Sequence, residues 1–196
     1  MKLCIADPPY LGRAAIWYGS SMDKTKMGAI YGGISKVAYK PADYHPEAYL
    51  WDKPEKHQAL IKELEQDYDG FALCMAHDNL QVLLPMFSTK VKVCIWHKWT
   101  LPGGSSIVNT YEPVIVKVPK LRKKAKEGLT TPDLLIHKTR DGANFAGKKP
   151  EAFTHWLLDL MKYQEGDEVI DLFNGSGAIQ NAINSYYDTP SEQDLC

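Results

Sequence analysis

Apolar residues recur along the chain in five short runs that predict buried β-strands. The runs span Leu3–Ala6, Phe71–Ala76, Val91–Trp96, Pro113–Val118 and Glu168–Leu172. Near-continuous apolar stretches of this length are typical of strands that are covered on both faces, as in parallel sheets. The pattern therefore favours a sheet that lies inside the protein.

Helical periodicity lies between these runs. The stretch PEKHQALIKELEQDYDG begins at Pro54 and places its large apolar side chains on one face. A second stretch, KPEAFTHWLLDLMKYQEG, begins at Pro150, and a third helix is predicted from Ala178 to about Tyr187. Because strands and helices alternate, we expect a single α/β domain over residues 1–196, with a mainly parallel sheet flanked by helices.

The composition is that of an ordinary globular domain, since 44% of the 196 residues are apolar and 24% are charged. No stretch reaches the ~18 consecutive apolar residues of a membrane span, and the first residues lack the pattern of a signal peptide. We therefore expect a cytoplasmic protein that contacts no membrane. Cys4, Cys74 and Cys94 lie in apolar runs, where buried thiols are expected, so no metal site is predicted.

The stretch KLCIADPPYLG ends the first predicted strand abruptly. Pro8 and Pro9 have no backbone N–H with which to continue a ladder, so the strand stops at Asp7. One interpretation is a plain turn in which Asp7 caps the backbone and Tyr10 packs. The other is that an acid, a carbonyl and an aromatic ring are gathered at a strand end to perform chemistry.

A second signal, GDEVIDLFNGSGAIQNAI, lies near the other end of the sequence. A strand delivers Asp171 to its carboxyl end, and Gly175-Ser176-Gly177 then predicts a tight turn into a helix. Glycines at such a turn let a ligand approach the backbone, although they also serve in purely structural turns. The stretch lacks the third glycine and later acid of a dinucleotide site and the Gly-Lys-Ser/Thr of a P-loop. A nucleoside cofactor without a phosphate chain is therefore favoured.

Together these motifs resemble those of DNA amino-methyltransferases, which methylate exocyclic amines of bases. DPPY is similar to their catalytic motif, DLFNGSGA looks like their S-adenosylmethionine loop, and KKPEAFTHWLLDLMKYQEG resembles their Lys-Pro helix. WHKW and YEPVIVKVPK resemble the family's Trp-x-Lys and Tyr-Glu-Pro strands. In this sequence the motif that resembles the catalytic one comes first and the loop that resembles the cofactor loop comes last. This order is that of the permuted beta group, which is common in restriction-modification systems and bacteriophages. The resemblance covers nearly the whole chain and implies a circularly permuted, Rossmann-like methyltransferase fold.

The resemblance also implies roles for residues. Asp7 and the Pro8 carbonyl would accept the two amine hydrogens, Pro8 and Pro9 would hold that carbonyl in one direction, and Tyr10 would stack on a flipped base. The residues implied to bind S-adenosylmethionine are Asp171, Phe173, Asn174, Gly175, Ser176, Gly177, Lys149 and Pro150.

The first residue of the catalytic motif bears on the substrate. In the family, aspartate there implies methylation of adenine N6 in DNA, and serine is usual where cytosine is modified. Versions with asparagine modify protein glutamine, but they place the motif after the cofactor loop. The alternative is a catalytically impaired relative that binds nucleic acid or a protein partner.

A basic segment lies at about residues 117–149, where relatives carry their target-recognition insert. Ten basic and three acidic residues give it a charge of +7, against −1 for the whole chain. Such a segment can be a solvated loop, but its position favours contacts to DNA phosphates. The predicted phosphate contacts are Lys120, Arg122, Lys123, Lys124 and Lys126. Because the segment is short, we expect a short or degenerate recognition sequence.

The polar tail DTPSEQDLC follows the last predicted helix. In relatives a further strand follows that helix and carries an acid that binds the ribose hydroxyls of the cofactor. Loss of such charge-assisted hydrogen bonds weakens binding by about 10- to 100-fold. We therefore expect a fold truncated after the cofactor loop, which binds S-adenosylmethionine weakly until a second subunit, another protein or DNA completes the pocket.

Overall fold

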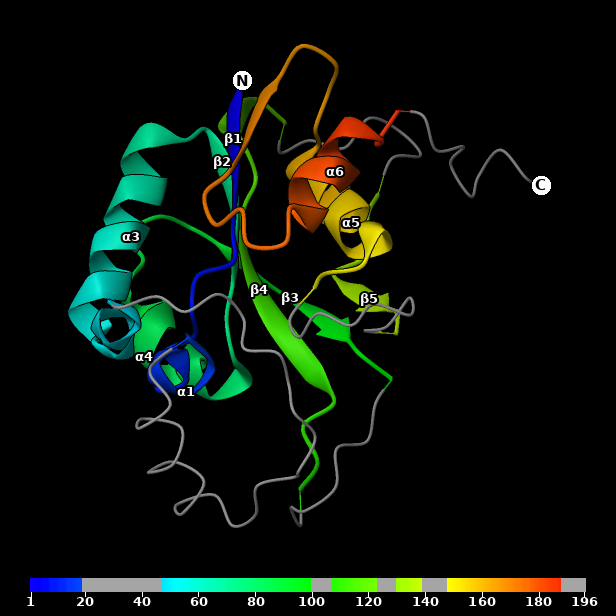
Figure 1. The fold of residues 1–196 in the computed structure, drawn as a ribbon. Coiled ribbons are helices and arrows are strands. Elements are labelled where there is room, and N and C mark those ends of the chain that lie inside the picture. Colours follow the sequence, from blue (N-terminus) through cyan, green and yellow to red (C-terminus); the bar gives the residue numbers. More distant parts are fainter. Residues whose placement is uncertain (19–46, 100–106, 123–129, 139–147, 188–196) are drawn as a thin grey trace.

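A six-stranded sheet forms the centre of the protein, with helices on both faces (Figure 1). The structure, a computed structural model, describes residues 1–18, 47–99, 107–122, 130–138 and 148–187. The strands lie in the order β5-β3-β4-β2-β1-β6. Their bounds are β1 Lys2–Ala6, β2 Gly70–Cys74, β3 Lys92–His97, β4 Tyr111–Lys117, β5 Leu134–Ile136 and β6 Glu168–Asp171.

Five of the six strands described run in the same direction. β1 is parallel to β2 and to β6, and β3 is parallel to β5, whereas β4 is antiparallel to both of its neighbours, β2 and β3. The predicted mainly parallel α/β sheet is confirmed. Because β4 runs in the opposite direction, its first residues lie at the edge of the sheet where β1, β2, β3 and β6 end.

Helices cover the two faces of the sheet. Their bounds are α1 Ala14–Tyr18, α3 Pro54–Asp67, α4 Leu80–Leu83, α5 Glu151–Met161 and α6 Ala178–Asn184, with 3-10 helices at Ala48–Asp52, His77–Asn79, Leu84–Met86 and Lys120–Arg122. In Figure 1, α1, α3 and α4 lie on one side of the sheet, and α5 and α6 lie on the other.

The alternation of side chains along β1 builds two cores. Leu3 and Ile5 pack in the cluster that contains the apolar face of α5, whereas Cys4 and Ala6 pack in the cluster that contains the apolar face of α3. All four side chains are fully buried. β1 is therefore covered on both faces, which explains why its sequence is continuously apolar.

The predicted elements are confirmed, with small differences at their ends. All five predicted strands are present, and the third helix ends at Asn184, before the expected Tyr187. β5 was not predicted, because it has three residues and two of its side chains are exposed. The three cysteines in apolar runs are free and buried, as expected. Within the part of the chain that the structure describes, no helix combines the length and apolarity that spanning a membrane requires.

Candidate active site

Asp7 lies directly after β1, at the carboxyl ends of the parallel strands. Pro8 and Pro9 cannot extend the ladder, and the chain turns into α1. The carboxylate of Asp52 accepts the first two backbone N–H groups of α1, at 2.9 and 3.0 Å. The proposed catalytic motif is therefore held between a buried strand and the anchored start of a helix.

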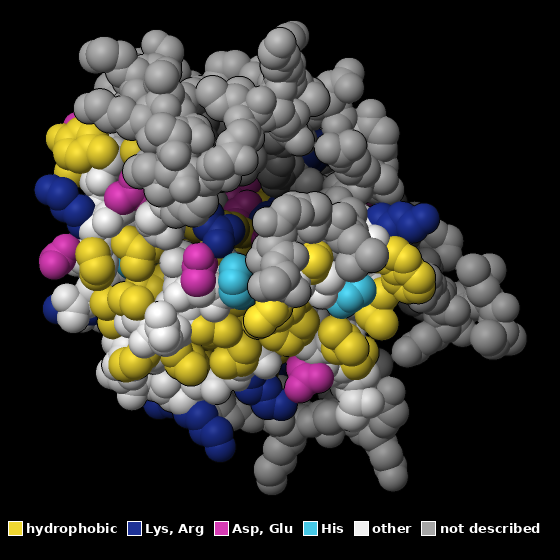
Figure 2. Space-filling view, turned by 90° about the horizontal axis from the view of Figure 1, so that it is seen from below, with side chains coloured by type: hydrophobic (Ala, Val, Ile, Leu, Met, Phe, Trp, Pro, Cys, Tyr) yellow, Lys and Arg dark blue, Asp and Glu magenta, His cyan; other side chains and the backbone are white. Residues whose placement is uncertain are grey.

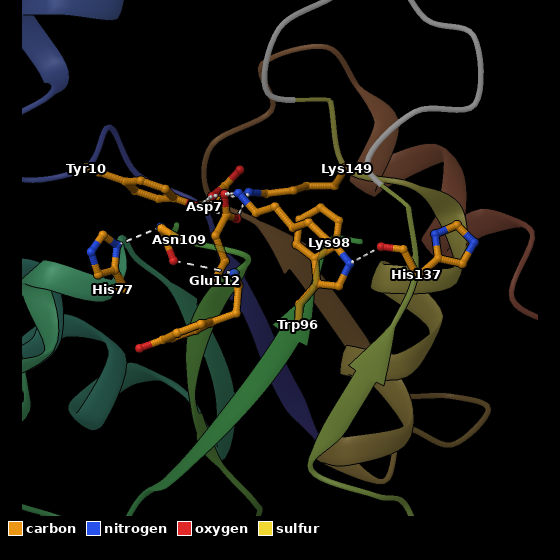
Figure 3. Close-up of polar contacts among 10 residues, drawn as sticks. Asp7, Tyr10, His77, Trp96, Lys98, Asn109, Glu112, His137 and Lys149 are labelled. Atoms are coloured by element: carbon orange, nitrogen blue, oxygen red, sulfur yellow. Dashed lines mark hydrogen bonds and ion pairs between the residues drawn. The ribbon is translucent and has the colours of Figure 1, made fainter. Parts of the chain in front are cut away.

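Tyr10 and Lys149 reach toward Asp7 from opposite sides (Figure 3). The Tyr10 hydroxyl lies 3.0 Å from Asp7 Oδ1, and the Lys149 ammonium lies 3.3 Å from the same oxygen. Lys149 also donates a hydrogen bond to the Tyr10 hydroxyl, at 2.9 Å. The predicted catalytic motif and the lysine of the Lys-Pro helix thus meet at one carboxylate oxygen.

Glu112, near the start of β4, contributes a second carboxylate. Its Oε2 lies 2.9 Å from Lys149 Nζ and 3.1 Å from the Tyr10 hydroxyl, while its Oε1 pairs with the Lys98 ammonium. The side chains of Lys149, Glu112 and Asp7 are 7%, 13% and 19% exposed. Two carboxylates and two ammonium groups therefore share one largely buried cluster.

The cluster changes the protonation equilibria of its members. Burial raises the pKa of Asp7, which Lys149 opposes and Glu112 reinforces. Burial would also raise the pKa of Glu112, but Lys149 and Lys98 bring it to about 2. Burial would lower the pKa of Lys149, yet Asp7 and Glu112 raise it well above its ordinary value. Lys149 therefore stays an ammonium and Glu112 a carboxylate, which leaves Asp7 as the acid that can take up a proton.

The glycine loop lies beside this cluster because β6 pairs in parallel with β1. Asp171 is in register with Ile5, and the N–H of Leu172 donates to the Ile5 carbonyl at 3.1 Å. Residues 174–176 are exposed, and Gly177 has a φ of +72°, which L side chains rarely adopt. The loop therefore presents exposed backbone at the edge of the sheet where Asp7 lies.

Contacts with the α3 side of the sheet anchor this loop. The Asp171 carboxylate accepts the N–H of Phe173 at 3.1 Å, and the Phe173 ring packs edge-on against Trp51, with ring centroids 5.2 Å apart. His57 holds the segment of Trp51, since its Nε2 lies 2.8 Å from the Trp51 carbonyl. Burial raises the pKa of Asp171, and the negative charge of Asp7 adds to the effect.

Lys149 and Pro150, which are predicted to bind the cofactor, lie directly before α5. Pro150 is buried as the residue before the helix. The Lys149 side chain points into the cluster of Asp7, Tyr10 and Glu112 (Figure 3). The structure thus brings Lys149 to the predicted catalytic motif, and the contact of Lys149 with the cofactor stays a prediction.

The predicted phosphate-binding residues are divided between two settings. Lys123, Lys124 and Lys126 lie outside the described residues, and Lys120 is exposed. Arg122 forms a two-pronged ion pair with Asp167, with Nη2 at 2.9 Å from Oδ1, and this pair lies next to the amino end of β1. Arg122 is therefore occupied at the end of the sheet opposite to Asp7.

Sequence reasoning did not assign Glu112 and Lys98 to the site. Lys98 stands in WHKW and Glu112 in YEPVIVKVPK, the stretches that resemble the Trp-x-Lys and Tyr-Glu-Pro strands, and this resemblance was the sequence signal that could have identified them. Their meeting depends on the antiparallel register of β3 and β4, in which Trp96 is paired with Glu112.

Figure 2 shows the surface of the protein from below. Acidic, basic and histidine side chains gather near the middle of this surface, beside a band of hydrophobic side chains.

A second polar contact flanks the cluster. The Asn109 amide nitrogen lies 2.7 Å from His77 Nδ1, and the His77 ring packs edge-on against Tyr111. Among the residues described, no group of three or more side chains could hold a metal ion.

Comparisons with known proteins find the same fold elsewhere. No protein-family model and no curated protein matches the sequence. The crystal structure of the M1.HpyAVI–SAM complex matches with a TM-score of 0.53 at 16% identity, over 95% of this chain and 78% of that chain. TTHA0409 from Thermus thermophilus, a candidate DNA modification methylase, matches with a TM-score of 0.50 at 16% identity, over 95% of this chain and 77% of that chain. The protein therefore shares the α/β fold of these two structures.

Proposed function

We propose that the protein transfers a methyl group from S-adenosylmethionine to the N6 amine of adenine in DNA. The observation that carries the proposal is the parallel pairing of β1 with β6, which places Asp7 beside the exposed glycine loop. The shared fold supports it, because one neighbour was solved with SAM and the other is a candidate DNA modification methylase. The order of the two motifs supports membership in the permuted beta group.

The glycine loop suits a nucleoside cofactor that carries no phosphate chain. Residues 174–176 are exposed and include no lysine or arginine, so the loop offers backbone groups and small polar side chains. The left-handed φ of Gly177 lets the backbone turn without a side chain at that point. S-adenosylmethionine bound there would supply a methyl group already activated by its sulfonium.

The residues at the end of β1 have the groups needed to hold an amine. An exocyclic amine is a poor nucleophile, because its lone pair is delocalised into the base. Asp7 and the carbonyl of Pro8 would each accept one amine hydrogen, which directs the lone pair. The raised pKa of Asp7 suits it to take up the proton that the methylated nitrogen releases.

Tyr10 would contact the target base, which must leave the stack before its amine can be reached. Its hydroxyl is held by Asp7, Glu112 and Lys149. These contacts fix the position of the hydroxyl and so limit the movement of the side chain, and a side chain that is already ordered loses less entropy when a base stacks on it.

Methyl transfer and binding, measured in parallel, test the proposal. The protein is incubated with methyl-labelled S-adenosylmethionine and duplex or single-stranded DNA, the DNA is digested to nucleosides, and DNA binding is measured with the same preparation. We expect the label in N6-methyladenine. Label in cytosine or in protein contradicts the proposed substrate, and DNA binding without any transfer favours the catalytically impaired alternative.

A further inference from the structure

We infer that Glu112 and Lys149 form a positioning pair that fixes Asp7 and Tyr10, so that one Asp7 oxygen is occupied and the other is left to receive the amine. The inference rests on the proposed function and deepens it. Neither residue of the pair needs to touch the reacting atoms, and each acts through the two side chains that do.

The Lys149 ammonium contacts three oxygens of the cluster. It donates hydrogen bonds to Glu112 Oε2 and to the Tyr10 hydroxyl, each at 2.9 Å, and it forms an ion pair with Asp7 Oδ1 at 3.3 Å. The rings of Trp96 and Phe153 lie 5.6 and 5.7 Å from the same nitrogen. The ammonium is therefore confined between aromatic rings and oxygens.

Asp7 is held through one oxygen only. Tyr10 and Lys149 both contact Oδ1, and no described residue donates a hydrogen bond to Oδ2. Two contacts at the same oxygen prevent the carboxylate from rotating freely. Oδ2 is consequently the oxygen that can accept an amine hydrogen.

Glu112 keeps the other members in place and balances the charge. Its Oε2 contacts both Lys149 and the Tyr10 hydroxyl, while its Oε1 pairs with Lys98. Glu112 lies in β4, whose register with β2 and β3 fixes its backbone. Without Glu112, the two ammonium groups would face Asp7 alone and would bind it more tightly.

The pair also sets how readily Asp7 takes up a proton. Besides Lys149 and Glu112, the described titratable groups that interact electrostatically with Asp7 are Tyr10, Tyr18 of α1, Cys74 of β2, Lys98 just after β3 and Asp171 of β6. Burial raises the pKa of Asp7, and Lys149 is the group that most opposes this. Loss of Lys149 should therefore raise the pKa of Asp7 further, and loss of Glu112 should lower it.

Two variants and a matched control test the pair. Lys149→Met and Glu112→Gln are compared with Lys148→Met, which removes the same charge at the exposed neighbouring residue. The carboxyl carbon of Asp7, assigned with Asp7→Asn, is followed by NMR as pH is varied, and circular dichroism checks the fold of each variant. We expect the pKa of Asp7 to rise in Lys149→Met, to fall in Glu112→Gln and to stay unchanged in Lys148→Met.

Kinetics supply a second measurement. In Lys149→Met we expect kcat at neutral pH to fall by about 100-fold while KM for DNA changes little, because a misplaced reacting group costs about that much. The acidic limb of its pH profile should move to higher pH. An Asp7 titration that is the same in wild type and Glu112→Gln overturns the pair even if Lys149→Met fails to fold.

The two proposals can fail separately, since the titration requires no turnover. If the wild-type protein transfers no methyl group, opposite changes in the titration of Asp7 in the two variants still support the positioning pair, and unchanged titrations still overturn it.

Discussion

Two cations of the basic segment, Arg122 and Lys149, are used inside the protein, at opposite ends of β1. Arg122 pairs with Asp167 near the amino end, and Lys149 joins Asp7 and Glu112 at the carboxyl end. A third cation, Lys117, donates to backbone carbonyls at the end of α3. At the scale of residues, the charge of +7 therefore overstates what the segment can offer to a polyanion.

The Arg122–Asp167 pair predicts a stability that depends on pH. Burial alone would raise the pKa of Asp167, but Arg122 and the Met1 ammonium lower it from 3.8 to about 2. Because the pKa is lower in the folded state, the stabilisation is fully present above the unfolded value and is lost as pH falls toward about 2.

We therefore expect Arg122→Gln to lower the free energy of unfolding at pH 7 by about 1.5–3 kcal/mol, as for hydrogen bonds to charged groups. The variant should also lose less stability than wild type between pH 5 and pH 2. Urea denaturation at several pH values measures both effects, and parallel curves for the two proteins would contradict this role of Arg122.

Residues that carry a local signature could be predicted, whereas residues that depend on strand register could not. Asp7 and Tyr10 stand in one four-residue motif after an apolar run. Glu112 and Lys98 join them only because β4 runs against β3, and the Tyr10–Glu112 contact spans 102 positions of sequence. No periodicity or spacing in one sequence reports a contact of that kind.

At the scale of elements, apolar patterning was sufficient where an element is buried and failed where it is exposed. β1 and β2 are almost wholly buried and were predicted to within two residues. β5 exposes Leu134 and Ile136, and so its three residues could not be distinguished from a loop. The reversed direction of β4 also left no trace in its own sequence, because a strand buried on both faces looks the same in either direction.

The basic segment gives the prediction that belongs to this scale. If residues 123–126 contact phosphates, Lys123→Gln combined with Lys124→Gln should flatten the dependence of log affinity for DNA on log salt concentration by about 1.8, at about 0.9 per contact. Arg122→Gln serves as the control. Because the Arg122 guanidinium is already paired with Asp167, its loss should leave the slope unchanged. Equal slopes in wild type and the double variant would show that Lys123 and Lys124 contact no phosphates, as expected of a solvated loop.

At the scale of the whole molecule, the sheet places Asp7 and the glycine loop at the carboxyl ends of two neighbouring parallel strands, β1 and β6. Among the described strands, β6 has β1 as its single neighbour. Only Ser185, Tyr186 and Tyr187 are described after α6, and none of them is an acid that could bind the ribose hydroxyls of a cofactor. The expectation that another chain or DNA completes the cofactor pocket therefore stays a prediction.

Calorimetric titration of the 196-residue chain checks that expectation. We expect S-adenosylmethionine to bind weakly, about 10- to 100-fold below an affinity that includes the ribose contact. Addition of duplex DNA or a rise in protein concentration should strengthen binding if either completes the pocket. Submicromolar affinity of the dilute chain alone would contradict the prediction.

The central claim is that Asp7 and the glycine loop form one centre for methyl transfer to adenine, and a matched comparison of wild type with Asp7→Ala tests it most directly. Both proteins receive methyl-labelled S-adenosylmethionine and duplex DNA, and the label in N6-methyladenine is counted beside the cofactor affinity of each. We predict transfer by wild type and a rate at least about 100-fold lower in Asp7→Ala, with cofactor affinity largely retained, because an orienting group in a preorganised site contributes about that much. Turnover near the wild-type rate in Asp7→Ala would contradict the claim.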